Sequence, residues 1–388
     1  MSHAVPLSIL GGLTAEQFLQ DYWQKKPLLV RNALPALAGL FEPADLRELA
    51  VQEGVTARLL IEGDGSSGRT GRWQVRHSPL TAKDFKKLPP RYTLLVQAVD
   101  HWSLELSQLW QQLDFLPQWR RDDVMISYAP RGGSVGQHFD WYDVFLVQAH
   151  GARRWQLGKW CTADTPLLPD QPLRLLTDLG EVFFDEIVQP GDLLYVPPGL
   201  SHHGVAENDC LTASFGFRMP SARQLLERLV DEVLAEPATQ IPLREQRTQP
   251  VQQTALVPQT DLEALSSQLR TLLEDPHWLN QATMALLSES NFPDTQSSHD
   301  PLDAAEWAAA LADGVQGLRD PAVRLLYTES GEFWLNGERL PVQPEHRDVL
   351  QALANGEILS AAELAVLDAA TVSDWLERGL LLLDLAGD

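Results

Sequence analysis

Short apolar runs separated by turn residues dominate the middle of the chain, from about Asp122 to Arg218. The runs have the length of strands and are rich in β-branched and aromatic residues, whereas Gly, Pro and Asp lie between them. Many short strands without intervening helices predict an antiparallel sandwich or barrel, of which the double-sheet jelly roll is one form. The expected strands are Val124–Tyr128, Asp143–Gln148, Arg154–Leu157, Val182–Phe184, Asp192–Val196 and Leu211–Phe217.

The segment before this region predicts short helices and one strand. Thr14 and Gln17 have the spacing of a capping box, and apolar residues then recur at helical spacing as far as Pro27. Residues 28–30 are expected to form a short buried strand, and residues 43–52 a second helix. Residues 63–71, GDGSSGRTG, predict a flexible turn.

After Arg218 the pattern becomes helical. Residues 225–234 carry one apolar stripe that ends before Pro237, and residues 262–273 form a second amphipathic pattern. Residues 237–260 are rich in Gln, Pro and Thr, which predicts a linker between these two helices. Helical character continues beyond Pro276, and the segment 290–301 is a second break.

The remainder reads as a small separate unit. A hairpin is expected from strands at 323–327 and 332–335, followed by a tight turn at Asn336-Gly337, with helices around it. Helices with a small hairpin predict a winged-helix-like domain. From Pro301 onward there are five arginines, no lysine and sixteen acidic residues, a net charge of −11, which argues against binding of DNA.

Composition narrows the function classes. The formal charge of the whole chain is −23, so its surface repels phosphate backbones and attracts a basic partner, although acidity also simply keeps a protein soluble. Only two cysteines are present and they form no CxxC pair, which excludes a thiolate zinc site. No membrane span and no secretion signal is recognised, so we expect a cytoplasmic protein.

The candidate chemistry centres on Gln137-His138-Phe139-Asp140. If this segment is a strand, His138 and Asp140 share one face and Phe139 turns to the other layer. His202 follows the turn–strand–turn sequence PGDLLYVPPGLS and supplies a third ligand, with His203 as its rival. Two imidazoles and one carboxylate suit Fe(II) and leave positions open for an anionic chelate such as a 2-oxoacid.

A dicarboxylate bound at this metal needs a cation at the far end of its pocket. Arg153 and Arg154 begin an expected strand, and only one of two neighbours can face the interior. An inward arginine in a barrel is costly unless it is paired, so it predicts an anion. The alternative is that both arginines lie in solvent at the mouth of the strand.

These motifs resemble the JmjC-type cupin hydroxylases, and most closely the bacterial ribosomal oxygenases. The resemblance rests on ISYAPRGGSVGQHFDWYDVFLVQAHGARRW, PGDLLYVPPGLSH and FLQDYWQKKPLLV, and it extends over nearly the whole chain. It implies a double-stranded β-helix with flanking helices, a helical region that forms a homodimer, and a C-terminal winged-helix-like domain. The implied divisions are 1–90 as the N-terminal part of the catalytic unit, 91–219 as the β-helix, 220–295 as the dimerisation region and 296–388 as the winged-helix-like domain.

The resemblance also implies the cofactors and the reaction. Fe(II) would be held by His138, Asp140 and His202, the cosubstrates would be 2-oxoglutarate and O₂, and Arg153 would pair with the distal carboxylate of 2-oxoglutarate. The bacterial members hydroxylate an arginine of a basic large-subunit ribosomal protein. Alternatives are an oxygenase acting on histidine or methyl-lysine of another basic protein, or a non-catalytic metal-binding scaffold.

Four further residues are assigned from their neighbourhood. Tyr142 and Asp143 follow the HxD motif on the same chain segment, and Asp143 is a candidate partner for a substrate guanidinium or, alternatively, an ordinary turn or surface carboxylate. Ser127 and Ser214 lie in expected barrel strands and are candidates to line the cosubstrate pocket.

Overall fold

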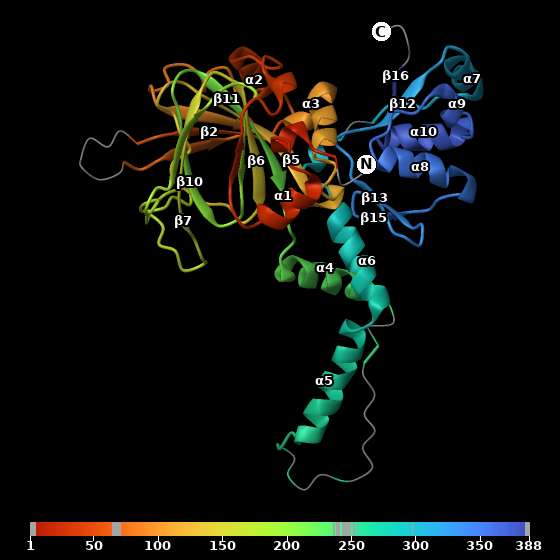
Figure 1. Cartoon of the computed structure of the whole chain (residues 1–388). Coiled ribbons are helices and arrows are strands. Elements are labelled where there is room, and N and C mark those ends of the chain that lie inside the picture. The colour runs from red at the N-terminus through yellow and green to blue at the C-terminus, as the bar shows by residue number, and fades with distance from the viewer. Residues whose placement is uncertain are drawn as a thin grey trace. The chain divides into compact units, whose positions relative to one another are not determined.

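Figure 1 shows the computed structural model of the chain. The structure describes residues 5–63, 71–235, 255–296 and 298–384, together with the single residues 237, 241, 242, 250 and 253. Most of the turn expected at 63–71, and much of the linker expected at 237–260, lie outside these residues. The chain divides into two compact units, Met1–Met219 with Asn291–Ser297, and Pro220–Ser290 with Ser298–Asp388.

The first unit is built on two antiparallel sheets. An eight-stranded sheet has the order β1-β9-β6-β11-β5-β4-β2-β3, and a three-stranded sheet has the order β10-β7-β8. The strands are β1 (Leu28–Val30), β2 (Ala57–Ile61), β3 (Gln74–His77), β4 (Tyr92–Val96), β5 (Arg121–Ala129), β6 (Asp143–His150), β7 (Arg153–Trp160), β8 (Phe184–Val188), β9 (Leu193–Val196), β10 (Leu200–Ala206) and β11 (Cys210–Phe217).

Alternation along the strands separates two apolar layers. On β6, Val144 and Leu146 pack with Trp155 and Leu157 of β7, which fills part of the space between the two sheets. Phe145 and its alternate neighbours face the other way. There they pack against the helices α1 (Ala15–Asp21), α2 (Pro43–Leu49) and α3 (Leu104–Gln108), which cover the outer face of the large sheet.

Most of the expected elements of this unit are present, and the Thr14 capping box is confirmed by both of its hydrogen bonds. The strand at Leu200–Ala206 was not expected from the sequence. Its sequence LSHHGVA contains glycine and two histidines rather than a β-branched run, and pairing with β7 makes it a strand. The double-sheet core confirms the jelly-roll prediction.

The second unit combines helices with a small winged-helix fold. The helices are α4 (Ala222–Ala235), α5 (Gln259–Leu273), α6 (Pro276–Ser288), α7 (Ala304–Ala312), α8 (Arg347–Ala354), α9 (Ala361–Leu364) and α10 (Ala369–Glu377). The strands are β12 (Gln316–Arg319), β13 (Leu325–Tyr327), β14 (Phe333–Leu335), β15 (Glu338–Leu340) and β16 (Leu381–Asp384). Strands β13, β14 and β15 form the expected wing, in which Asn336 and Gly337 both have positive φ angles.

The helical segment and the winged-helix segment form one compact unit, whereas the sequence predicted two, divided at residue 296. The wing turn shows why, because Arg228 of α4 donates a hydrogen bond to the carbonyl of Gly337 and Gly337 N–H donates to Ser288 of α6. Such packing between distant segments leaves no mark on local periodicity. Among the described residues, no helix is both long and apolar enough to cross a membrane.

Candidate metal centre and active-site pocket

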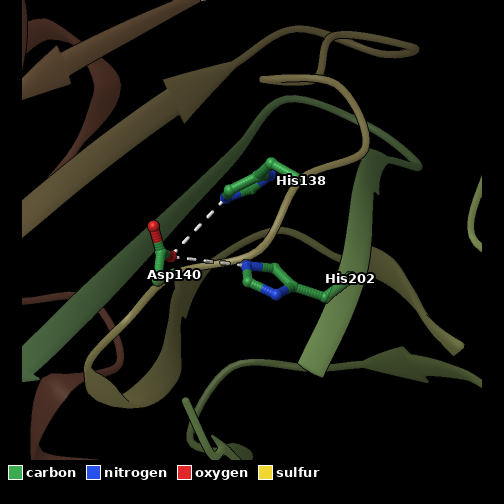
Figure 2. A group of neighbouring side chains, drawn as sticks. All are labelled: His138, Asp140 and His202. Atoms are coloured by element: carbon green, nitrogen blue, oxygen red, sulfur yellow. Dashed lines mark ion pairs between the residues drawn. The ribbon is translucent and has the colours of Figure 1, made fainter. Parts of the chain in front are cut away.

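Three side chains converge at one end of the space between the sheets of the first unit (Figure 2). The Nε2 atoms of His138 and His202 each lie 3.7 Å from Oδ2 of Asp140. Potential ligand atoms of all three lie within 4.8 Å of one another, and no other such group of His, Cys, Asp and Glu occurs among the described residues. The sequence therefore predicted correctly which three side chains would meet.

The backbone conformation that brings these three side chains together differs from the strand expected from the sequence. Residues 137–142 do not form a strand, and His138 makes only a single antiparallel bridge with His202 of β10. The two residues exchange backbone hydrogen bonds, from His138 N–H at 3.1 Å and from His202 N–H at 2.8 Å. Because the segment is not pleated, Phe139 is not turned away but lines the same pocket as His138 and Asp140.

Each imidazole is oriented by a carbonyl of its own segment. Nδ1 of His138 lies 3.0 Å from the oxygen of Gly136, and Nδ1 of His202 lies 2.9 Å from the oxygen of Leu200. A carbonyl only accepts, so in the neutral tautomers both Nδ1 atoms carry the proton and both Nε2 lone pairs face Asp140. Burial lowers the pKa of His202 to about 4, and this neutral state is the one that binds metal.

His203, the rival of His202, turns the other way along β10. His202 is only 3% exposed and lines the pocket, whereas His203 is partly exposed and does not line it. Burial also lowers the pKa of His203, and the nearby charges of His138 and Arg153 act in the same direction. Strand alternation therefore leaves His202 as the one of the pair that meets Asp140.

The two neighbouring arginines of β7 separate in the same way. Arg154 faces solvent and pairs with Asp185 and Glu207. Arg153 faces inward at 2% exposure, and its guanidinium donates a hydrogen bond to Sγ of Cys210 at 3.6 Å. No carboxylate among the described residues pairs with Arg153. A buried guanidinium without an anion is costly, so this arrangement fits a bound carboxylate.

The cluster and Arg153 line one cavity of about 520 Å³. Ser127 of β5 and Ser214 of β11 line it, as the sequence suggested, and so does Tyr142. Burial raises the pKa of Tyr142 well above its ordinary value, so its hydroxyl stays neutral. Further residues of the cavity wall include Arg58, Leu60, Leu95, Met125, Val144, Leu146, Trp155, Arg174, Thr212 and Arg218.

Asp143 does not reach this cavity. It is the first residue of β6 and points with Phe145 to the outer face, opposite to Val144. There it is fully buried, accepts hydrogen bonds from Tyr195 at 2.6 Å and Gln24 at 2.9 Å, and pairs with Arg120 at 3.0 Å. The suggested contact with a substrate guanidinium is therefore at odds with the structure, and Asp143 instead braces the sheet against the N-terminal segment.

Comparisons with known proteins agree with this site. Residues 108–225 match the family model of the JmjC domain, and residues 271–381 match that of the ROXA-like winged helix. A probable ribosomal oxygenase of Haemophilus influenzae is 42% identical over 95% of this chain and 93% of its own length. The ribosomal protein uL16 3-hydroxylase of Escherichia coli is 32% identical over 89% of both chains.

The chain belongs to the JmjC-type ribosomal oxygenases. Among solved structures, E. coli YcfD superposes on this ribosomal oxygenase with a TM-score of 0.83 at 30% identity, over 96% of this chain and 98% of YcfD. YcfD has also been solved with cobalt and 2-oxoglutarate, and that structure superposes with a TM-score of 0.80 over the same shares of the two chains.

The residues of this ribosomal oxygenase fit a divalent metal with a dicarboxylate beside it. Two neutral imidazoles and one carboxylate are a donor set for Fe(II) with open positions, and no carboxylate in the described part of the chain pairs with the inward Arg153. Sequence reasoning missed Thr212 and Arg58 in the cavity wall. Thr212 was within reach, because it lies two residues from Ser214 on the same strand face, whereas no local signal marked Arg58.

Proposed function

We propose that this chain is an Fe(II)- and 2-oxoglutarate-dependent hydroxylase of a ribosomal protein, acting on an arginine side chain of the large-subunit protein uL16. The observation that supports this most directly is the shared cavity of His138, Asp140, His202 and Arg153, an arginine that pairs with no carboxylate of the described residues. The substrate follows from the E. coli relative named a uL16 3-hydroxylase and from the resemblance to the arginine-hydroxylating bacterial members.

In this proposal His138, Asp140 and His202 hold the metal, and Arg153 fixes the far carboxylate of 2-oxoglutarate through its planar fork. With both bound, O₂ is reduced, 2-oxoglutarate is decarboxylated to succinate, and one oxygen atom enters a C–H bond of the substrate. The role of the protein residues is to position the metal, 2-oxoglutarate and the substrate. Leu146, Val144 and Trp155 make the cavity wall apolar beside the metal cluster, and this limits the access of water.

The charges and the cavity define how a basic substrate is received. A net charge of −23 draws a basic ribosomal protein toward the surface by electrostatic steering. Asp140 is the only carboxylate in the cavity wall among the described residues, so a substrate guanidinium meets neutral acceptors there. We assign this role to the Tyr142 hydroxyl, and we place Ser127 and Ser214 at the cosubstrate.

The helical segment of the second unit supports a homodimer. Helix α5 has no buried residue among its described side chains, and Leu262, Leu265 and Leu269 on it are between 48% and 56% exposed. An amphipathic helix with its apolar face uncovered requires a partner surface, for which we propose a second copy of the chain. We further propose that the protein acts in the cytoplasm, where ribosomal proteins are made. Because the winged-helix segment is acidic, we propose that it does not bind DNA.

Purified protein with Fe(II), 2-oxoglutarate and recombinant uL16 tests the proposal. We expect succinate release coupled to the gain of one oxygen atom on one arginine of uL16, located by tandem mass spectrometry. Modification of a histidine or loss of a methyl group from lysine would assign the enzyme to another JmjC activity. Binding of metal without any consumption of 2-oxoglutarate would identify a scaffold instead.

A further inference from the structure

Arg58 of β2 occupies an unusual place for an arginine. It lies on the face of the large sheet that lines the cavity, on the same side of its strand as Leu60, and it shares that cavity with His138, Asp140 and His202. Its side chain is half-buried, and it makes no ion pair or hydrogen bond with any described residue. Its Nε atom is shut off from water without a partner.

The strand register links Arg58 to the interior. Across the sheet, Arg58 pairs with Leu95 of β4, Leu95 with Ser127 of β5, and Ser127 with Thr212 of β11. All four line the cavity, so they form one row on its floor. At the usual spacing between strands, the row is about 14 Å long from Arg58 to Thr212.

The far end of this row meets Arg153. Cys210 lies two residues before Thr212 on the same face of β11, and its Sγ accepts the hydrogen bond of Arg153. The hydroxyls between the two arginines are engaged within the protein, because Ser127 donates to the carbonyl of Thr212 and Thr212 donates to Gln148. The two arginines at the ends of one row are therefore the groups that suit a small dicarboxylate.

The charge of the protein surface explains why a dicarboxylate would need a positively charged group at the cavity. The chain carries a charge of −23, which repels a dianion from most of the surface. The cavity wall has the opposite charge balance, because Arg58, Arg153 and Arg174 line it against one carboxylate of the described residues, Asp140. Arg218 also lines the cavity, but it is paired with Asp122. A cleft lined by one sign of charge raises the local concentration of the opposite ion and its association rate.

We infer that Arg58 is the first carboxylate-binding position for 2-oxoglutarate on its way into the cavity, ahead of its final place at Arg153. The inference rests on the proposed function. Arg58 would hold the dianion transiently, before it moves along the row to Arg153. A carboxylate side chain of the protein substrate is the other source of the same chemistry, and the experiment separates the two.

The test compares Arg58→Gln with Arg76→Gln, which removes the same charge from the adjacent strand β3. Arg76 is paired in register with Leu59 of the outer core, so it lies on the opposite face of the sheet, where it pairs with Asp84. Binding of 2-oxoglutarate to the cobalt-loaded protein is followed by stopped-flow tryptophan fluorescence at low and high salt, and the KM for uL16 is measured separately with the iron enzyme.

We expect Arg58→Gln to slow association of 2-oxoglutarate roughly threefold or more at low salt, with the difference lost at high salt. The Kd for 2-oxoglutarate and the KM for uL16 stay unchanged, because Arg58 holds the dianion only in transit and dissociation therefore slows by the same factor. Arg58→Lys retains the wild-type rates, and Arg76→Gln has no such effect. A raised KM for uL16 with normal 2-oxoglutarate binding overturns the inference in favour of a substrate carboxylate. Equal rates for both glutamine variants overturn it altogether. If the wild-type protein binds no 2-oxoglutarate, the proposed function itself has failed.

Discussion

His138 and His202 are joined by two backbone hydrogen bonds, and their imidazole rings lie 4.2 Å apart between centroids. The pair connects a loop to the first residues of β10, so one local contact places two side chains of the proposed metal site that are more than sixty residues apart in sequence. With both Nδ1 atoms held by carbonyls, the Nε2 atoms face Asp140. The backbone pairing and the two carbonyls together fix the orientation of both rings.

Replacing Arg153 by Gln should weaken binding of 2-oxoglutarate about tenfold to a hundredfold, because a charge-assisted pairing with its distal carboxylate is lost. Calorimetry on the cobalt-loaded protein measures this directly. Arg154→Gln is the matched control, since Arg154 faces solvent and pairs only with Asp185 and Glu207. Equal loss in both variants would contradict the assignment of Arg153.

Asp143→Asn should destabilise the fold by about 3–5 kcal/mol, because it leaves the Arg120 guanidinium buried without its counter-charge. Urea unfolding measures the free energy. The KM for uL16 should stay unchanged for the folded fraction, since Asp143 points away from the cavity. A raised KM with unaltered stability would restore Asp143 as a substrate contact.

Metal-free protein should lose stability as the pH falls below about 6.5. Burial depresses the pKa of His202 in the folded state to about 4, so between these two values the unfolded chain binds a proton that the folded chain does not. The contribution of His202 is fully present above pH 6.5, and its loss amounts to about 3 kcal/mol by pH 4. Thermal unfolding of the chelator-treated wild type and of His202→Gln over this range should show the steeper slope in the wild type. Parallel slopes would contradict the prediction.

Changing Leu262, Leu265 and Leu269 of α5 together to Ser should convert a dimer to a monomer. The wild-type protein is expected at twice the 43.3 kDa of one chain in light scattering after size exclusion, and the triple variant at 43.3 kDa. Gln268→Ala on the same helix should remain dimeric. A wild-type protein that already runs as a monomer would rule out the proposed dimer.

The local sequence pattern was sufficient to predict the core strands and the three clustered side chains. The strands β5, β6, β9 and β11 carry clear apolar runs, and the HxD motif with the distal histidine named the correct cluster. From the sequence, either Arg153 or Arg154 could be the arginine that faces the cavity. Only the strand register, set by the pairing of β7 with β8 and β10, decides that it is Arg153.

The errors come from contacts between distant segments. Leu200–Ala206 becomes a strand by pairing with β7, although its own residues favour none. Asp143 follows the metal motif in sequence, yet the alternation that starts at β6 turns it to Arg120 and Tyr195. Residues 220–290 join the winged-helix segment because Arg228 and Ser288 bind the wing turn. Single-sequence reasoning has no access to such pairings.

Mass spectrometry of ribosomal proteins from cells with and without this gene tests the proposed hydroxylation of uL16. We expect one additional oxygen atom on a single arginine of uL16 when the gene is present, restored by the wild-type gene and not by His138→Ala. Identical uL16 masses in all strains would contradict the ribosomal assignment, and restoration by His138→Ala would contradict the metal centre itself.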